Sequence, residues 1–158
     1  MSKKIVLGTV CLFALNLISF ASAAGGGSMI PMNAKDTGSA RIVGVTGTVL
    51  HTVDTGRGQA THLGLYTLAA TQDIDVVTGT VTNGAFTLTA ASGDTVSGSY
   101  SGQALPGLVG YTVSGPITGG TGRFAGAMGF LVWNGTVDPL ALTFTDEIVG
   151  TISSTGGR

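Results

Sequence analysis

Two histidines and two of the three tyrosines are the side chains in this sequence best suited to acid–base chemistry or ligand binding. His51 shares one face of an alternating run with Val49 and Val53, near the end of that run. Imidazole titrates near neutral pH. His51 is therefore a candidate ligand-binding residue at the rim of a cavity, where an imidazole is suited to act as a general base, although a hydrogen-bonded rim residue is the favoured interpretation.

His62, Tyr66 and Tyr100 are the other candidate ligand-binding residues. His62 and Tyr66 are four residues apart in one run and share a face, yet about 13 Å of extended chain separates them, so they do not contact each other. They line a pocket if that face points inward, and they lie on the surface if it points outward. Tyr100 alternates with small polar residues in a later run.

A metal centre is not favoured. His51 and His62 come together if the segment 54–59 connects their strands, and Asp54 is then the nearest third ligand. However, the sequence has no His-x-His spacing and a single Cys, and zinc sites need a compact set of such ligands. We expect neither a metal nor a cofactor.

The remaining chemical groups give no catalytic assignment. Asp73 and Asp75 share a face, while Asp146 and Glu147 are adjacent and lie on opposite faces. Paired acids of glycoside hydrolases must project inward at about 5 to 9 Å from each other; solvated surface charge is the favoured interpretation here. The sequence has no Gly-x-Ser-x-Gly motif.

Composition indicates a turn-rich β protein of one domain. The 158 residues include 27 Gly, 43% are apolar and only 9% are charged, whereas average chains have about 25% charged residues and about 7% Gly. Acidic and basic residues nearly cancel, with a formal net charge of -1. Nucleic acid is therefore not an expected partner, because no strong field attracts phosphates.

Residues 1–23 have the pattern of a cleaved signal peptide. Lys3 and Lys4 precede an apolar stretch, and Ala21-Ser22-Ala23 is a signal-peptidase site. The stretch is shorter than the roughly 20 residues of a membrane span. Cleavage would remove Cys11 together with this segment. We therefore expect a cysteine-free chain in the periplasm or the medium, with no membrane insertion after processing.

The mature sequence divides into two parts. Residues 24–39 are rich in glycine and lack sustained periodicity, which predicts a flexible leader. From residue 40 to residue 158, apolar residues alternate with polar ones, and turn residues interrupt the alternation about every 8 to 12 residues. Asn83-Gly84 is expected to form a hairpin turn. The alternating runs are 42–53, 60–69, 73–82, 86–90, 95–101, 109–117, 128–133 and 140–148.

These runs predict an all-β fold with a closed eight-stranded antiparallel barrel. A sheet with so few charges would leave its edge strands open to aggregation. Closing the sheet removes those edges.

A glycine-rich block over residues 117–129 resembles a known family. It reads Ile-Thr-Gly-Gly-Thr-Gly-Arg-Phe-Ala-Gly-Ala-Met-Gly and is similar to the Gly-Gly-x-Gly-x-Phe-x-Gly-Ala-x-Gly segment of plant allene oxide cyclases. It is less similar to the Gly-Gly-Thr-Gly segment of dirigent proteins. Together with Thr61-His62-Leu63-Gly64 and Ala90-Ala91-Ser92-Gly93-Asp94, it also resembles bacterial secreted proteins of uncharacterised role.

The resemblance implies the eight-stranded allene oxide cyclase barrel and a possible cavity. Allene oxide cyclases isomerise an unstable lipid epoxide, and dirigent proteins orient phenoxy radicals. Their cavity residues have no counterparts here outside the glycine block, so the resemblance implies a fold rather than a reaction.

The same block has a structural interpretation. Gly119, Gly120, Gly122 and Gly126 permit positive φ and close backbone approach, so that Phe124 can tuck under one end of the barrel. An anion-binding loop that uses Arg123 is the alternative, but such loops precede a helix, and a predicted strand follows here.

Three classes of function remain open. The first is an exported barrel that binds a small apolar or phenolic ligand in its lumen. The second is a solid-cored structural or self-associating extracellular protein, and the third is a cyclase or isomerase. His62, Tyr66 or Tyr100 in an apolar lumen would favour ligand binding or catalysis. A lumen filled with Leu, Val and Phe would favour the structural role.

Overall fold

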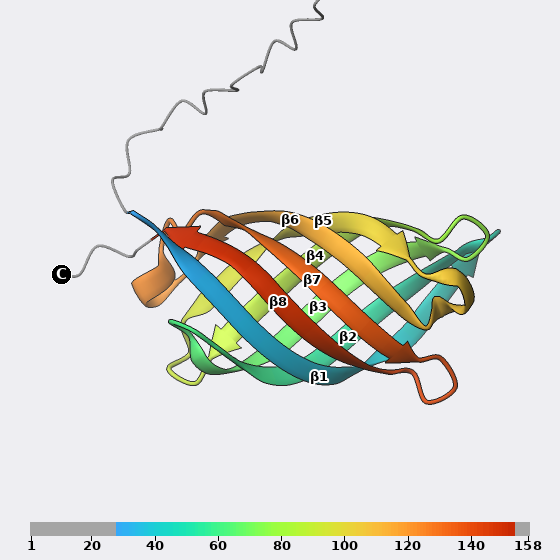
Figure 1. Ribbon diagram of the computed structural model, residues 1–158, viewed down its shortest axis with the longest axis horizontal. Helices are drawn as coiled ribbons and strands as arrows, with labels where there is room; N and C mark the ends of the chain where they lie inside the picture. Colours follow the sequence, from blue (N-terminus) through green and yellow to red (C-terminus); the bar gives the residue numbers. More distant parts are fainter. Residues whose placement is uncertain (1–27, 154–158) are drawn as a thin grey trace, which may run out of the picture.

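The computed structural model describes residues 28–153 and shows one closed antiparallel barrel of eight strands (Figure 1). Each strand pairs with its neighbours in sequence, and β1 pairs with β8. The predicted all-β closed barrel is therefore confirmed. The predicted signal peptide lies outside the described residues. The strands are β1 (Met29–Thr46), β2 (Val49–Ala60), β3 (Gly64–Asp75), β4 (Thr80–Ala90), β5 (Thr95–Ala104), β6 (Gly110–Gly120), β7 (Gly129–Asp138) and β8 (Thr143–Ser153).

Two short 3-10 helices complete the described chain, η1 (Pro106–Leu108) and η2 (Gly122–Phe124). Within residues 28–153, no helix has the length and apolar character needed to cross a bilayer.

The barrel begins earlier than the sequence predicted. β1 starts at Met29 and pairs with β8 from that residue onward, so the expected leader is wrong for residues 29–39. Met32, Ala34 and Asp36 alternate inward in this stretch and are buried. The alternation is weak in the sequence because, after Met32, its inward positions hold alanine, aspartate and glycine rather than large apolar residues.

The expected hairpin turn at Asn83-Gly84 is also wrong. Both residues lie inside β4, where the register with β5 shifts between Val81 and Gly84. Asn83 does adopt a positive φ of 52°, so the dipeptide's backbone freedom forms a β-bulge in place of a turn. The turn itself precedes β4, where the Gly79 amide donates to the Asp75 carbonyl at 2.7 Å.

Aromatic rings in the lumen lie opposite glycines on neighbouring strands. An eight-stranded barrel is only wide enough for its side chains to fill it, so a large ring needs a small partner. In four cross-strand pairs of a glycine and an aromatic residue, a Cβ added to the glycine would meet the ring. The cross-strand pairs are Gly38 with Phe144, Gly84 with Tyr100, Gly98 with Phe86, and Gly135 with Tyr111.

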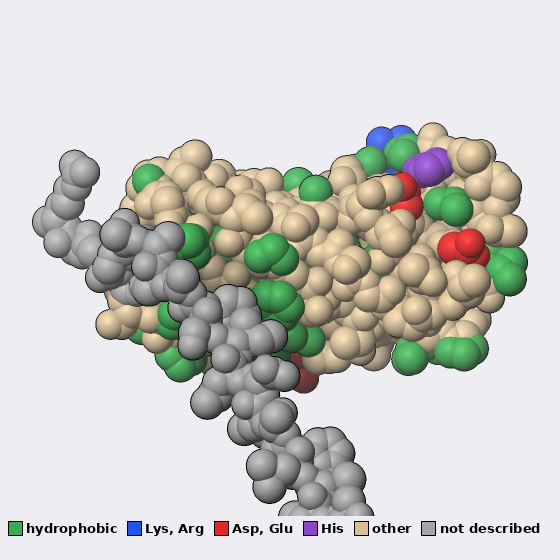
Figure 2. All heavy atoms as spheres, turned by 90° about the horizontal axis from the view of Figure 1, so that it is seen from above, with side chains coloured by type: hydrophobic (Ala, Val, Ile, Leu, Met, Phe, Trp, Pro, Cys, Tyr) green, Lys and Arg blue, Asp and Glu red, His purple; other side chains and the backbone are tan. Residues whose placement is uncertain are grey.

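The outer wall is polar but carries few charges. In Figure 2, hydrophobic and charged side chains are scattered over a face that consists mostly of other side chains and backbone. Hydroxyl residues supply much of this wall, for example Ser97 and Ser99 on β5 and Thr143 and Thr145 on β8.

One end of the barrel is closed by the glycine block. η2 lies at this end (Figure 1), and Phe124 is buried, as is Leu63 in the turn between β2 and β3. Gly122 and Gly126 adopt positive φ values of 56° and 74°. Gly120 allows close approach, because a Cβ there would lie 2.9 Å from the Cβ of Phe124, whereas a Cβ on Gly119 would meet nothing within 4 Å.

Arg123 connects the glycine block to the neighbouring turns at this end. Its guanidinium lies 4.8 Å from the centre of the Phe124 ring, donates to the Leu63 carbonyl at 3.1 Å and approaches Asp94 at 3.5 Å. These contacts fit a structural role for the block better than an anion-binding loop.

We expect Phe124→Ala to lower the free energy of unfolding by about 3 to 5 kcal/mol, because it removes a buried aromatic side chain. Chemical denaturation measures the change. Phe130→Ala is the control, since Phe130 is 49% exposed on the outer face of β7. Equal stability of the Phe124→Ala protein and the wild type would contradict the role of this ring.

We expect Gly98→Ala to destabilise the barrel by about 1 to 3 kcal/mol through overpacking. Its new Cβ would meet the Pro116 carbonyl and lie 2.7 Å from the Phe86 ring. Gly119→Ala is the matched control, because the Cβ there meets open space. Thermal unfolding gives the melting temperatures of the two variants, and that of Gly98→Ala should be the lower. Equal melting temperatures would contradict the packing of lumenal rings against glycines.

Candidate functional site

The barrel opens at the end opposite η2. A pocket of about 200 Å³ lies there, between β1, β2, η1 and the loop before β8. We call it the mouth pocket. Its floor is polar and consists of Thr52, Asp54, Gln72 and Tyr111. The apolar residues of its wall include Ile42, Leu50, Ile74, Leu108, Val137 and Leu142.

A second, smaller cavity lies behind the mouth pocket, with Asp54, Gln72, Tyr111 and Phe144 lining both. We call it the deep cavity. Its volume is about 20 Å³, which is room for one water-sized group. Its other lining residues include Phe86, Tyr100, Trp133 and Asp146. The lumen is therefore packed in its middle and open at one end. It matches neither the open ligand-binding lumen nor the completely filled lumen that the sequence left as alternatives.

Three carboxyl groups lie in the lumen. Asp36, Asp54 and Asp146 are each at most 6% exposed. Asp36 and Asp146 are direct cross-strand partners in β1 and β8. We call these three residues the acid layer.

Neutral side chains donate hydrogen bonds to the acid layer. The Tyr66 hydroxyl donates to Asp36 Oδ2 at 2.6 Å, and the Tyr111 hydroxyl donates to Asp146 Oδ1 at 2.6 Å. The Gln72 amide donates to Asp54 Oδ2 at 2.8 Å.

Some buried oxygens of this region have no partner within residues 28–153. These atoms are Asp36 Oδ1, Asp54 Oδ1 and Thr52 Oγ1. An unpaired buried acceptor costs about 1 to 3 kcal/mol. Thr52 and Asp54 are among the residues that line the mouth pocket.

Burial raises the pKa of all three carboxyl groups of the acid layer above the ordinary value of 3.8. It raises the pKa of Asp54 to about 6, although the neighbouring Thr52 hydroxyl and Gln72 amide offset part of the rise. Burial and the nearby Asp36 raise the pKa of Asp146 to about 7, against the opposing hydrogen bond from Tyr111. The pKa of Asp36 also rises because of burial.

The lumenal tyrosines remain neutral donors. Burial raises the pKa of Tyr66, Tyr100 and Tyr111 above the ordinary value of 10, and the nearby carboxylates raise it further. Phenol groups that keep their protons can donate to carboxylates throughout the physiological range.

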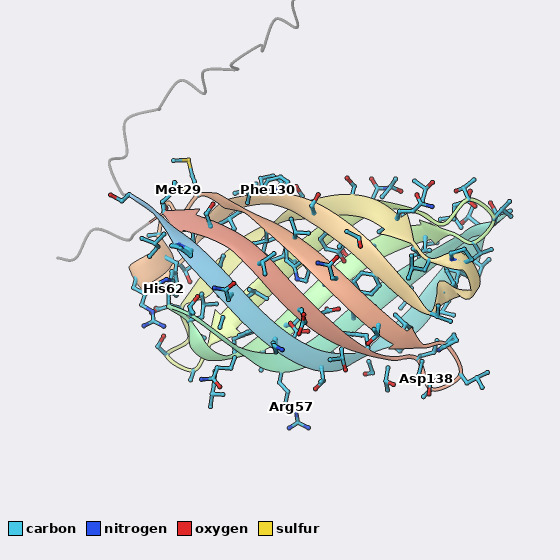
Figure 3. The ribbon with its side chains drawn as sticks, viewed as in Figure 1. Met29, Arg57, His62, Phe130 and Asp138 are labelled. Atoms are coloured by element: carbon cyan, nitrogen blue, oxygen red, sulfur yellow. The ribbon has the colours of Figure 1, made fainter. Side chains whose placement is uncertain are left out.

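The two histidine candidates lie outside the lumen. On the outer face, His51 Nδ1 lies 2.6 Å from Asp73 Oδ1 and His51 Nε2 lies 3.0 Å from Thr46 Oγ1. His62 is in the β2–β3 turn at the closed end (Figure 3), with a positive φ of 70°, and its Nε2 lies 3.0 Å from the Pro31 carbonyl oxygen of β1. They therefore lie near opposite ends of β2, and the segment 54–59, expected to connect two strands, belongs to β2 itself.

The two tyrosine candidates do line the lumen. Tyr66 faces Asp36, and Tyr100 lies 5.7 Å from the Trp133 ring, with its hydroxyl donating to the Thr71 carbonyl at 3.2 Å. His62 and Tyr66 do not share a face, because a turn separates them.

The acid layer is what sequence reasoning missed. Asp146 was expected to be solvated, yet it is 2% exposed. The signal was present: Asp146 is in phase with the buried Phe144 and Ile148 of its own strand. Asp36 was hidden in the supposed leader, and Asp54 had been considered only as a metal ligand.

A larger depression of about 870 Å³ lies on the outer wall. It is lined by exposed residues that include Thr37, Thr55 and Thr145. The mouth pocket is the better candidate site, because it combines apolar walls with buried polar atoms.

No known family model and no curated protein matches this chain. The resemblance to allene oxide cyclases and dirigent proteins therefore stays a prediction, and the function must be argued from the geometry.

We expect the protein to become more stable as the pH falls from 8 to 5. Asp54 and Asp146 bind protons more tightly when folded than at their ordinary pKa of 3.8. Their contribution is complete below the ordinary pKa and is lost as the pH rises through about 6 and 7. Asp54→Asn should raise the free energy of unfolding by about 3 kcal/mol at pH 8 and by little at pH 4.

Thermal and chemical unfolding between pH 4 and pH 8 measure this difference. Glu147→Gln is the control, because Glu147 neighbours Asp146 in sequence but lies on the outer face with Lys35. A stability difference between Asp54→Asn and the wild type that stays constant over this range would contradict the account.

Proposed function

We propose that this protein binds a small, mostly apolar molecule in the mouth pocket and holds one polar group of that molecule at Asp54 and Thr52. The observation that carries the proposal is the pairing of apolar walls with unpartnered buried oxygens on the floor. A ligand that donates a hydrogen bond to Asp54 removes the cost of that unpaired acceptor. Phenols and other hydroxylated arenes have the required shape and donor.

The proposal includes export. Residues 1–23 have the pattern of a signal peptide, so the ligand would be met in the periplasm or the medium. Mass spectrometry of the protein secreted by its host would give a mature chain that begins at Ala24.

Trp133 provides a direct assay. It is the only tryptophan of the sequence, and it lines the deep cavity behind the mouth pocket. We expect 2-phenylethanol, used as a probe, to change its fluorescence in a saturable way. Ala40→Phe should weaken binding at least about 10-fold, because Ala40 lines the mouth pocket and the added ring would fill it.

Ala85→Phe is the matched control, because Ala85 is exposed on the outer face of β4. It should bind the probe as the wild type does. Unchanged affinity in the Ala40→Phe protein would place the binding elsewhere, and no saturable signal with any small arene would refute the proposed function.

A further inference from the structure

The deep cavity combines carboxyl groups with aromatic rings. Asp54 and Asp146 line it together with Tyr100, Tyr111 and Trp133. The ring centres of Tyr100 and Trp133 are 5.7 Å apart. Faces of tryptophan and tyrosine attract cations, and more strongly where water is excluded.

The lumen has acidic groups but no basic side chain among the described residues. Lys35, Arg41 and Arg57 of β1 and β2 are exposed, and Arg57 extends away from the barrel (Figure 3). Lys35 pairs with Glu147 on the outside, and Arg123 is exposed at the closed end, over Phe124. Within residues 28–153, no cation of the chain itself therefore offsets the acid layer.

The unpaired hydrogen-bond acceptor of the site also favours a positively charged ligand group. Asp54 Oδ1 is a buried acceptor without a donor in the described part of the chain, and Asp54 lines both the mouth pocket and the deep cavity. An ammonium group has three donors and no acceptor, whereas a hydroxyl group brings one donor together with lone pairs. Asp54 and Asp146, which both line the deep cavity, are therefore better satisfied by an ammonium group.

We propose that the polar group of the ligand is a primary ammonium, so that the protein binds arylalkyl or alkyl amines with the ammonium at Asp54 and the apolar body in the mouth pocket. The inference rests on the proposed function and specifies its ligand class. The deep cavity of about 20 Å³ admits a group the size of water. A primary ammonium fits this volume, and a trimethylammonium group does not.

Amine binding then depends on pH through the acid layer. The titratable groups that face the lumen are Asp36 on β1, Asp54 on β2, Asp146 on β8 and three tyrosines on β3, β5 and β6. Since the pKa of Asp54 is about 6 and that of Asp146 about 7, acidification from pH 7.5 to pH 5 neutralises them. An aliphatic amine keeps its charge over this range, so its affinity should fall with the pH.

The test compares three probes of one shape by calorimetry and Trp133 fluorescence at constant ionic strength. These are phenethylamine, 2-phenylethanol and phenethyltrimethylammonium. At pH 7.5 we expect phenethylamine to bind at least 10-fold more tightly than either of the others. At pH 5 its advantage over the alcohol should fall to within about 2-fold.

Asp54→Asn keeps the shape of the side chain and removes its charge, so it should abolish the preference for the amine. Glu147→Gln, on the outer face, should keep it. The melting temperature of each variant confirms folding, and the probe series on the wild type stands even if one variant fails to fold.

The outcomes separate the two proposals. Equal binding of the alcohol and the amine overturns the ammonium assignment and leaves the proposed function in place. Tight binding of the trimethylammonium probe also overturns it, because that group cannot enter the deep cavity. Binding of none of the probes overturns both proposals.

Discussion

The width of an eight-stranded barrel is the constraint on which this structure depends. Such a lumen leaves room for one layer of side chains at each level, and this chain fits four large rings into it by setting a glycine opposite each. Tyr111 lies over Gly135, and Tyr100 lies over Gly84. The rings thereby fill the middle of the barrel. The Tyr111 hydroxyl reaches Asp146 on β8, and the Tyr100 hydroxyl reaches the Thr71 carbonyl on β3, so each spans the lumen past the adjacent strand. The high glycine content is a consequence of this packing as well as of the turns.

The acid layer is the feature that packing alone does not explain. Apolar residues of similar volume would stabilise the lumen more than buried carboxyl groups do. Natural sequences break such rules mainly at functional sites. Asp54 lies where the packed lumen meets the mouth pocket and lines both cavities. Among residues 28–153, the buried residues at the closed end, such as Phe124, Leu63 and Ala127, are apolar.

The sequence predicted the sheet well and the site poorly, for the same physical reason. Alternation is read from large apolar residues, and it located the strands that contain Phe86 and Leu88, which are buried as an alternating pair. It failed to extend β1 to Asp36, where inward positions hold small or charged residues, and charge alone suggested a solvated Asp146 although that residue is in phase with Phe144 and Ile148. The hairpin prediction at Asn83-Gly84 was wrong because residues that tolerate a positive φ occur in β-bulges as well as in turns. Only closure of the barrel brings Asp36 beside Asp146, since β1 and β8 are far apart in sequence.

The central claim is that the lumen holds buried carboxyl groups which no cation of the described chain neutralises. A titration of the aspartate side-chain carbons by NMR tests it most directly, with each signal assigned by an Asp→Asn variant. The account predicts that Asp54 titrates with a pKa of about 6 and Asp146 with one of about 7. Titration of both residues near the ordinary value of 3.8 would show that water or a counter-ion solvates the acid layer, and would contradict the account.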